Sequence, residues 1–127
     1  MEQRRVVITS VGVVSPLGLG VDDFWAGLME GRCGIGRIRS FDPVRMPCQI
    51  AGEAPDYAIR DYIPKSYRKA AKLMCRDIEL SVIAADEAIR NSGYISRAID
   101  PERVNLRPER TAIDFGSGII SCELPEI

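Results

Sequence analysis

The sequence contains no histidine among its 127 residues. A Ser-His-Asp or Cys-His catalytic arrangement therefore cannot be completed within it, and the commonest protein ligand for metal ions is missing. The cysteines are widely spaced and form no C-x-x-C pair: Cys33, Cys48, Cys75 and Cys122. This spacing favours reduced thiols over a disulfide framework or a zinc site. We expect neither a metal nor a cofactor.

The sequence also lacks a long apolar run and a strong charge imbalance. No stretch approaches the roughly 18 apolar residues that span a bilayer, and Met1 to Arg5 is too polar to begin a secretory signal. Seventeen basic and eighteen acidic residues leave a formal net charge of −1, so no global charge attracts nucleic acid or an anionic membrane. We expect a cytoplasmic protein with no nucleic-acid partner and no membrane partner.

Strand and helix signals alternate along the chain, which is 46% hydrophobic and can bury a core. Arg5 to Val14 is predicted to form a mostly apolar strand buried on both faces. Val21 to Gly31 is predicted to form a short helix with Asp22 as its N-cap and Gly31 as its stop. Arg32 to Pro64 is rich in proline, which disfavours long elements there except for a short strand around Cys48 to Gly52. This order is typical of an α/β protein.

The clearest element runs from Pro64 to Gly93. Apolar residues recur there at spacings of three and four, which predicts one long amphipathic helix or two helices nearly in line. Pro64 suits the first turn, and Gly93 supplies the stop. A second strand is predicted from Thr111 to Phe115, before another glycine-rich loop. Asp114 within it would need a polar partner, because burying an unpaired carboxylate is costly.

Basic residues are ordered along the first half of this predicted helix. Most recur at spacings of three and four and share the face opposite Met74 and Ile78. The set consists of Lys65, Arg68, Lys69, Lys72 and Arg76. These residues form either a solvated face that keeps the helix soluble or a docking surface for an acidic partner. The charge pattern alone leaves both interpretations open.

The first glycine-rich loop raises the question of phosphate binding. A dinucleotide fingerprint needs G-x-G-x-x-G between a strand and a helix, and the corresponding positions here are Ser10, Gly12 and Ser15. The second loop, Gly116 to Ser121, fits no better. We therefore expect no nucleotide site at either loop.

The segment RRVVITSVGVVSPLGLGVDDFWAGLMEGRCGI resembles the amino-terminal opening of the β-ketoacyl-acyl carrier protein synthases, condensing enzymes of the thiolase fold. FDP at 41–43, AADEAIRNSG at 84–93 and GSGI at 116–119 continue the resemblance in the family's order. It implies the amino-terminal part of an α/β, thiolase-like layered fold, with residues 1–127 as one incomplete domain. It also implies that the first loop is architectural, with its glycines and Pro16 packing closely.

The resemblance has departures that indicate a divergent branch of the family. Ser10, Ile120 and Ser121 stand where the family usually has glycine, and Asp114 replaces an apolar residue. In the family a cysteine nucleophile and two histidines, or a histidine and an asparagine, lie well downstream of GSGI. The resemblance therefore implies no catalytic residue in residues 1–127, which we expect to be inactive alone. Cys122 lies in the wrong context for that nucleophile.

The family's reaction condenses an acyl thioester with malonyl-acyl carrier protein, with loss of CO2, in fatty acid or polyketide synthesis. Acyl carrier proteins are acidic, and the family's docking patch includes basic residues that match Lys69 and Lys72 most directly. The resemblance also implies a homodimer in the full-length form. The second loop borders the acyl pocket in the family, so Ile119 becomes a candidate for a residue beside the substrate. The alternative is an ordinary buried isoleucine.

Two functions of different classes follow from these features. The chain is the amino-terminal part of a condensing enzyme, or it is a short non-catalytic module, like chain-length-type relatives, that binds a carrier protein or a partner subunit. A reading frame that continues beyond Ile127 with a cysteine motif and two histidines predicts the enzyme, and an immediate stop predicts the module. A truncated product that does not fold stably is a third possibility.

Overall fold

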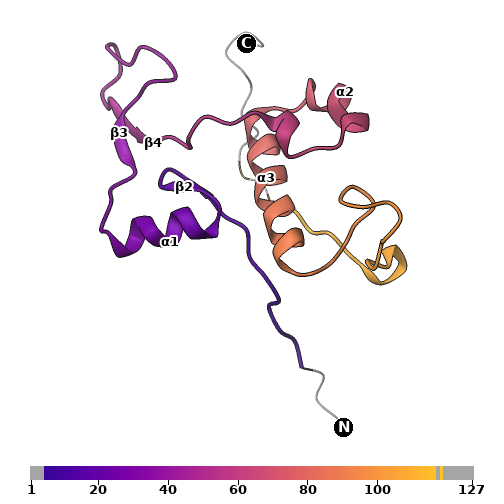
Figure 1. The fold of residues 1–127 in the computed structure, drawn as a ribbon. Helices are drawn as coiled ribbons and strands as arrows, with labels where there is room; N and C mark the ends of the chain where they lie inside the picture. Colours follow the sequence, from indigo (N-terminus) through magenta and orange to yellow (C-terminus); the bar gives the residue numbers. More distant parts are fainter. Residues whose placement is uncertain (1–4, 117, 119–127) are drawn as a thin grey trace.

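The computed structural model describes residues 5–116 and residue 118 (Figure 1). The elements in chain order are β1 Val14–Ser15, β2 Gly18–Leu19, α1 Val21–Met29, β3 Ile35–Arg37, β4 Ile50–Gly52, η1 Ile59–Asp61, η2 Lys65–Tyr67, α2 Arg68–Ala71, α3 Arg76–Asn91 and η3 Pro108–Arg110. β1 and β2 form one antiparallel pair, and β3 and β4 form another, with Ile35 opposite Gly52. The described residues therefore combine helices with two-stranded sheets. The larger layered arrangement stays a prediction.

Neither long predicted strand is present among the described residues. Within Arg5 to Val14 only Val14 pairs with another strand, and Thr111 to Phe115 has no strand partner. Val6 is 94% exposed and Ile113 is 78% exposed. A strand needs a neighbouring strand to pair with, and a strand buried on both faces also needs layers that cover it. The described residues supply neither for these two segments. Asp114 is exposed. The prediction of a carboxylate buried within a strand is therefore wrong as well.

The region predicted as one helix or two forms separate helices. The α2 helix ends at Ala71, and the N–H groups of Leu73 and Met74 bond to carbonyls three residues back. Cys75 is extended, with φ −73° and ψ 164°, and α3 begins at the next residue. In Figure 1, α2 lies to one side of the upper end of α3. The prediction of two helices is therefore confirmed, but they are not in line.

The predicted helix stops are confirmed, whereas the predicted N-cap is wrong. Gly31 and Gly93 follow α1 and α3 with φ of +65° and +75°, the left-handed conformation that glycine adopts readily. The N-cap residue of α1 is Gly20, without a side-chain cap of its own. Asp22 instead lies in the first turn, where a negative charge favours the helix dipole. The predicted short strand near Cys48 to Gly52 is confirmed as β4.

The first loop packs directly on α3, as the resemblance implied. A β-carbon at Gly12 would lie 1.9 Å from the carbonyl oxygen of Ala84, so only glycine allows this backbone approach. The hydroxyl of Ser10 donates to the carbonyl of Ala88 at 2.6 Å. Pro16 lies between Gly34 and Gly52, where a β-carbon on either glycine would come within 2.7 Å of the proline ring. The loop therefore serves close packing.

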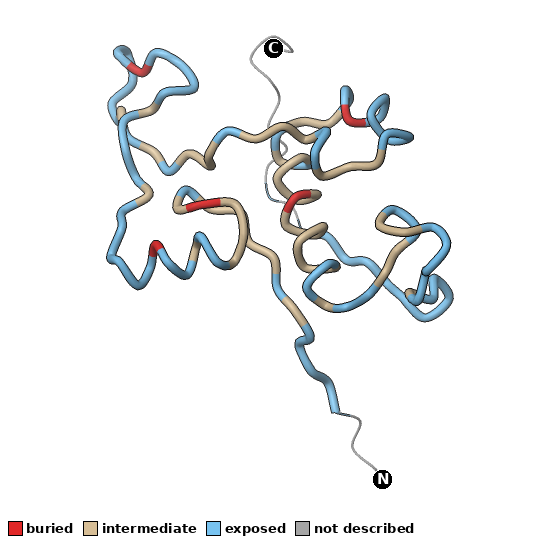
Figure 2. The backbone as a smooth tube through the Cα atoms, in the orientation of Figure 1, coloured by how far each residue is buried: buried red, intermediate tan, exposed pale blue. Residues whose placement is uncertain are grey.

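Burial is sparse in the described part of the chain. Its buried apolar side chains are Ala71, 8% exposed, Ile83, 3% exposed, and Pro43 in the loop between β3 and β4. Figure 2 shows intermediate burial along α3 and exposure over most of α1 and the β3–β4 hairpin. Trp25 on α1 is 62% exposed. The described segments therefore leave many apolar side chains open to solvent.

The carboxylate of Glu53, the residue after β4, binds the start of the loop that follows β3. Glu53 accepts hydrogen bonds from the backbone N–H groups of Arg39 and Ser40, each at 3.0 Å. Hydrogen bonds from the side chain and backbone of Ser40, together with those from Arg39, lower the pKa of Glu53 from 4.5 to about 2. Glu53 is therefore ionised near neutral pH and has a structural role.

Replacing Gly12 by alanine should destabilise the intact polypeptide. The new methyl group would collide with the α3 backbone, and overpacking of this kind typically costs about 1–3 kcal/mol. Denaturant unfolding measures the loss. Gly36→Ala is the matched control, because a β-carbon there meets no atom within 4 Å among the described residues. Equal stability of the two variants would contradict the close packing of the loop on α3.

Acidification should loosen the β3–β4 hairpin. Because the pKa of Glu53 is lowered from 4.5 to about 2, its stabilising contribution is present above pH 4.5 and is lost as the pH falls toward 2. The amide shifts of Arg39 and Ser40, followed by NMR, should titrate with a midpoint near 2 in the wild type and show no such transition in Glu53→Gln. A wild-type midpoint near 4.5 would refute this role of the carboxylate.

Candidate functional site

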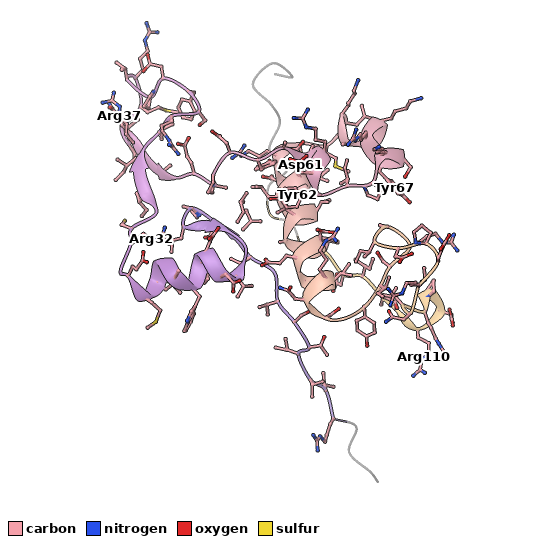
Figure 3. All side chains as sticks on the ribbon, viewed as in Figure 1. Arg32, Arg37, Asp61, Tyr62, Tyr67 and Arg110 are labelled. Atoms are coloured by element: carbon pink, nitrogen blue, oxygen red, sulfur yellow. The ribbon has the colours of Figure 1, made fainter. Side chains whose placement is uncertain are left out.

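Four of the five basic residues singled out by sequence lie on the short unit formed by η2, α2 and the C-cap residue of α2. We call the set the basic surface: Lys65, Arg68, Lys69 and Lys72. All are exposed, and none forms an ion pair within the described ranges. In Figure 3 the side chains of this unit, where Tyr67 is labelled, point outward from the molecule. The basic surface therefore presents uncompensated positive charge to solvent.

Arg76 has different surroundings from the basic surface. It is the first residue of α3, beyond the unwound residues 72–75. Its guanidinium carbon lies 5.3 Å from the centroid of the Tyr57 ring, in the range of a cation–π contact. It also lines a polar pocket with Glu53 and Asp56. The predicted set of five on one continuous helix face is thus corrected to four plus one, because the helix is interrupted after Lys72.

Sequence patterns gave no indication of the contact between Tyr57 and Glu79. The hydroxyl of Tyr57 donates to Oε2 of Glu79 at 2.8 Å. Tyr57 precedes η1, and Glu79 lies in the first turn of α3. This pair joins segments 22 residues apart in sequence, and periodicity within a helix carries no information about such partners.

An apolar pocket of about 350 Å³ lies between the start of α3 and the segment that leads to the second glycine-rich loop. Its walls include Cys75, Ile78 and Val82 from one side, and Phe115 and Gly116 from the other. Apolar walls with few polar groups are typical of sites for apolar ligands. The spacing of Ile78 and Val82 on one helix face was the available sequence signal. Ile119 lies outside the described residues, so its place beside this pocket stays a prediction.

The described residues offer no candidate metal centre. No group of three or more His, Cys, Asp or Glu side chains gathers within residues 5–116 and 118. Cys33, Cys48 and Cys75 are free thiols in this part of the chain, and Cys122 lies outside it. None of the helices described is long and apolar enough to cross a membrane.

Known proteins are similar to this chain in sequence and in fold. Residues 3–121 match the model of the family "Beta-ketoacyl synthase, N-terminal domain". The chain is 34% identical over 106 residues to 3-oxoacyl-[acyl-carrier-protein] synthase 2 of Synechocystis sp., covering 84% of this chain and 25% of that protein. It is 37% identical over 125 residues to the protein of the same name in Coxiella burnetii, covering 94% and 26%.

A solved structure, the ishigamide ketosynthase/chain length factor, is also similar. It has a TM-score of 0.60 and 34% identity, over 74% of this chain and 22% of that one. The chain spans about a quarter of the length of the curated relatives it matches. The family match nevertheless includes every residue that the structure describes. The chain therefore belongs to the β-ketoacyl synthase family, whose N-terminal domain model it matches over residues 3–121.

Proposed function

We propose that the polypeptide carrying this chain is a condensing enzyme that joins an acyl thioester to malonyl-acyl carrier protein with loss of CO2. The observation that carries the proposal is the family match over residues 3–121. Relatives named 3-oxoacyl-[acyl-carrier-protein] synthase 2 support it. The enzyme works in the cytoplasm as a homodimer in fatty acid or polyketide synthesis. Residues 1–127 form the amino-terminal part of its thiolase-like layered fold.

The proposed chemistry requires groups that residues 1–127 lack. A cysteine thiolate takes the acyl group from its carrier, and the carrier thiol leaves. Decarboxylation of the malonyl thioester then forms a carbanion, which attacks the acyl-enzyme thioester and releases the cysteine. Histidine side chains, or a histidine and an asparagine, stabilise the developing charge, and this chain has no histidine. Residues 1–127 are therefore inactive by themselves.

The role proposed for this chain is recognition. The basic surface is exposed and unpaired within the described ranges, so it suits an acidic carrier protein, whose approach it would accelerate. The apolar pocket beside Phe115 has the chemistry to receive part of an acyl chain. Ile119, outside the described residues, is proposed to lie beside the substrate. Docking and acyl recognition would thus use opposite ends of the segment that links α2 to α3.

A second function is a non-catalytic subunit that binds a carrier protein or a partner synthase. The similarity to the ishigamide ketosynthase/chain length factor favours this alternative. Both candidates use the same N-terminal domain, so residues 1–127 do not separate them. The separation rests on whether the intact polypeptide performs the condensation.

Turnover of the intact polypeptide tests the enzyme proposal. It is incubated with acyl-acyl carrier protein and carboxyl-labelled malonyl-acyl carrier protein, and labelled CO2 and the β-ketoacyl product are measured. Equal amounts of both products support the enzyme. Stable binding to a catalytic ketosynthase without turnover would support the subunit, and neither activity would overturn both proposals.

Reversal of Lys69 and Lys72 to glutamate should slow association with acyl carrier protein at least about tenfold at low ionic strength. The difference should shrink at high ionic strength, because salt screens exposed charges. Association rates measured by stopped flow provide the comparison. Arg107→Glu with Arg110→Glu is the matched control, since it also reverses two exposed charges, beside η3. Equal slowing by both double variants, or no slowing, would contradict docking on the basic surface.

A further inference from the structure

The two ends of segment 57–76 are held together by one tyrosine. Tyr57 stands at the beginning of this segment, and its ring lies under the guanidinium of Arg76 at its end, 5.3 Å from the ring centroid. The hydroxyl of the same tyrosine donates to Glu79 Oε2 at 2.8 Å. Tyr57 therefore makes two different contacts with the first turn of α3.

The entire basic surface lies within this closed segment, since it spans residues 65 to 72. The packing that fixes the segment is limited. Ala71 of α2 is buried, and η1 contacts α2. Tyr62 shares a pocket with Ile83 and Asp86 of α3, and Figure 3 shows Tyr62 and Asp61 at the upper part of that helix. The linker between α2 and α3 adds little packing, because Leu73 within it is 87% exposed.

The geometry points to Tyr57 as a positioning residue for the basic surface. By tying the start of the segment to the first turn of α3, it presents Lys65, Lys69 and Lys72 to an acidic carrier in one orientation. Arg76, which is exposed, supports this arrangement through its contact with the Tyr57 ring. The inference rests on the proposed docking function and adds to it the device that orients the docking residues.

Tyr57 should strengthen carrier binding because it lowers the entropic cost of ordering segment 57–76. Without the Tyr57 contacts, the segment samples more orientations, and a bound carrier must select one of them. The loss of affinity can then be at most the strength of the tie. For an exposed cation–π contact this corresponds to roughly two- to fivefold. Because the loss arises from orientation and not from charge, ionic strength should leave it unchanged.

The test compares Tyr57→Ala with Tyr57→Phe in the intact polypeptide. Amide hydrogen exchange across residues 59–74 should rise in Tyr57→Ala, while exchange across residues 81–91 of α3 stays at the wild-type level. Affinity for acyl carrier protein should fall roughly two- to fivefold at both low and high ionic strength. Tyr57→Phe keeps the ring under Arg76 and should retain most of the affinity. Unchanged exchange in Tyr57→Ala would overturn the inference.

Arg76→Gln provides a second variant in case Tyr57→Ala disturbs folding. It removes the cation and keeps the tyrosine, so it should weaken binding independently of salt. A loss seen only at low ionic strength would identify Arg76 as a direct charge contact and overturn its supporting role.

The Lys69→Glu and Lys72→Glu double variant separates this inference from the docking proposal. If that variant weakens binding while Tyr57→Ala leaves affinity unchanged, docking stands and the positioning role falls. If the double variant leaves association unchanged, the docking proposal falls and the inference falls with it.

Discussion

The carboxylate of Glu87 accepts hydrogen bonds from two backbone N–H groups on opposite sides of the first glycine-rich loop. The donors are Val13 at 2.8 Å and Val21 at 2.7 Å. Val21 is the first residue of α1, whose N–H has no partner within its own helix. Gly20 has φ +114°, and a β-carbon there would approach Glu87 to 3.0 Å. One side chain of α3 therefore fixes the loop and caps the helix that follows it.

The α3 helix contacts the first loop and the features to which the proposed function assigns roles. Its backbone packs against Gly12, and its Glu87 accepts a hydrogen bond from the N–H of Val13. Its first turn receives Tyr57, which closes the segment bearing the basic surface, and the same end forms a wall of the apolar pocket. The open apolar side chains around it, such as Ile8 at 86% exposed, suit the layered fold of the proposed enzyme, in which further elements would cover them.

Features encoded locally were predictable from sequence, and features made by distant partners were not. The opening motif indicated the family, and Gly31 and Gly93 marked the ends of two helices because a left-handed residue is a local requirement. Strand patterns failed for Arg5 to Val14 because a strand depends on neighbours that the pattern does not specify. The cap of α1 comes from Glu87, 66 residues away, which made the local candidate Asp22 misleading.

The candidate site also combines features that are encoded locally with features that depend on distant partners. The exposure of the basic residues could be predicted, because their spacing on a helix face is local. The break at residues 72–75 could not, since apolar periodicity continues through it. The unwound residues, which end at the extended Cys75, separate Arg76 from the other four. The role of Tyr57 depends on partners beyond its own element.

The most direct test compares the free energies of unfolding of Glu87→Gln and Asp86→Asn. Each variant removes one negative charge from α3. Glu87→Gln loses a carboxylate shared by two backbone donors and should lower the free energy of unfolding by about 1.5–3 kcal/mol. Asp86→Asn loses an ion pair with the exposed Arg90 and should cost less than about 1 kcal/mol. Equal losses would contradict the claim that Glu87 fixes the first loop on α3.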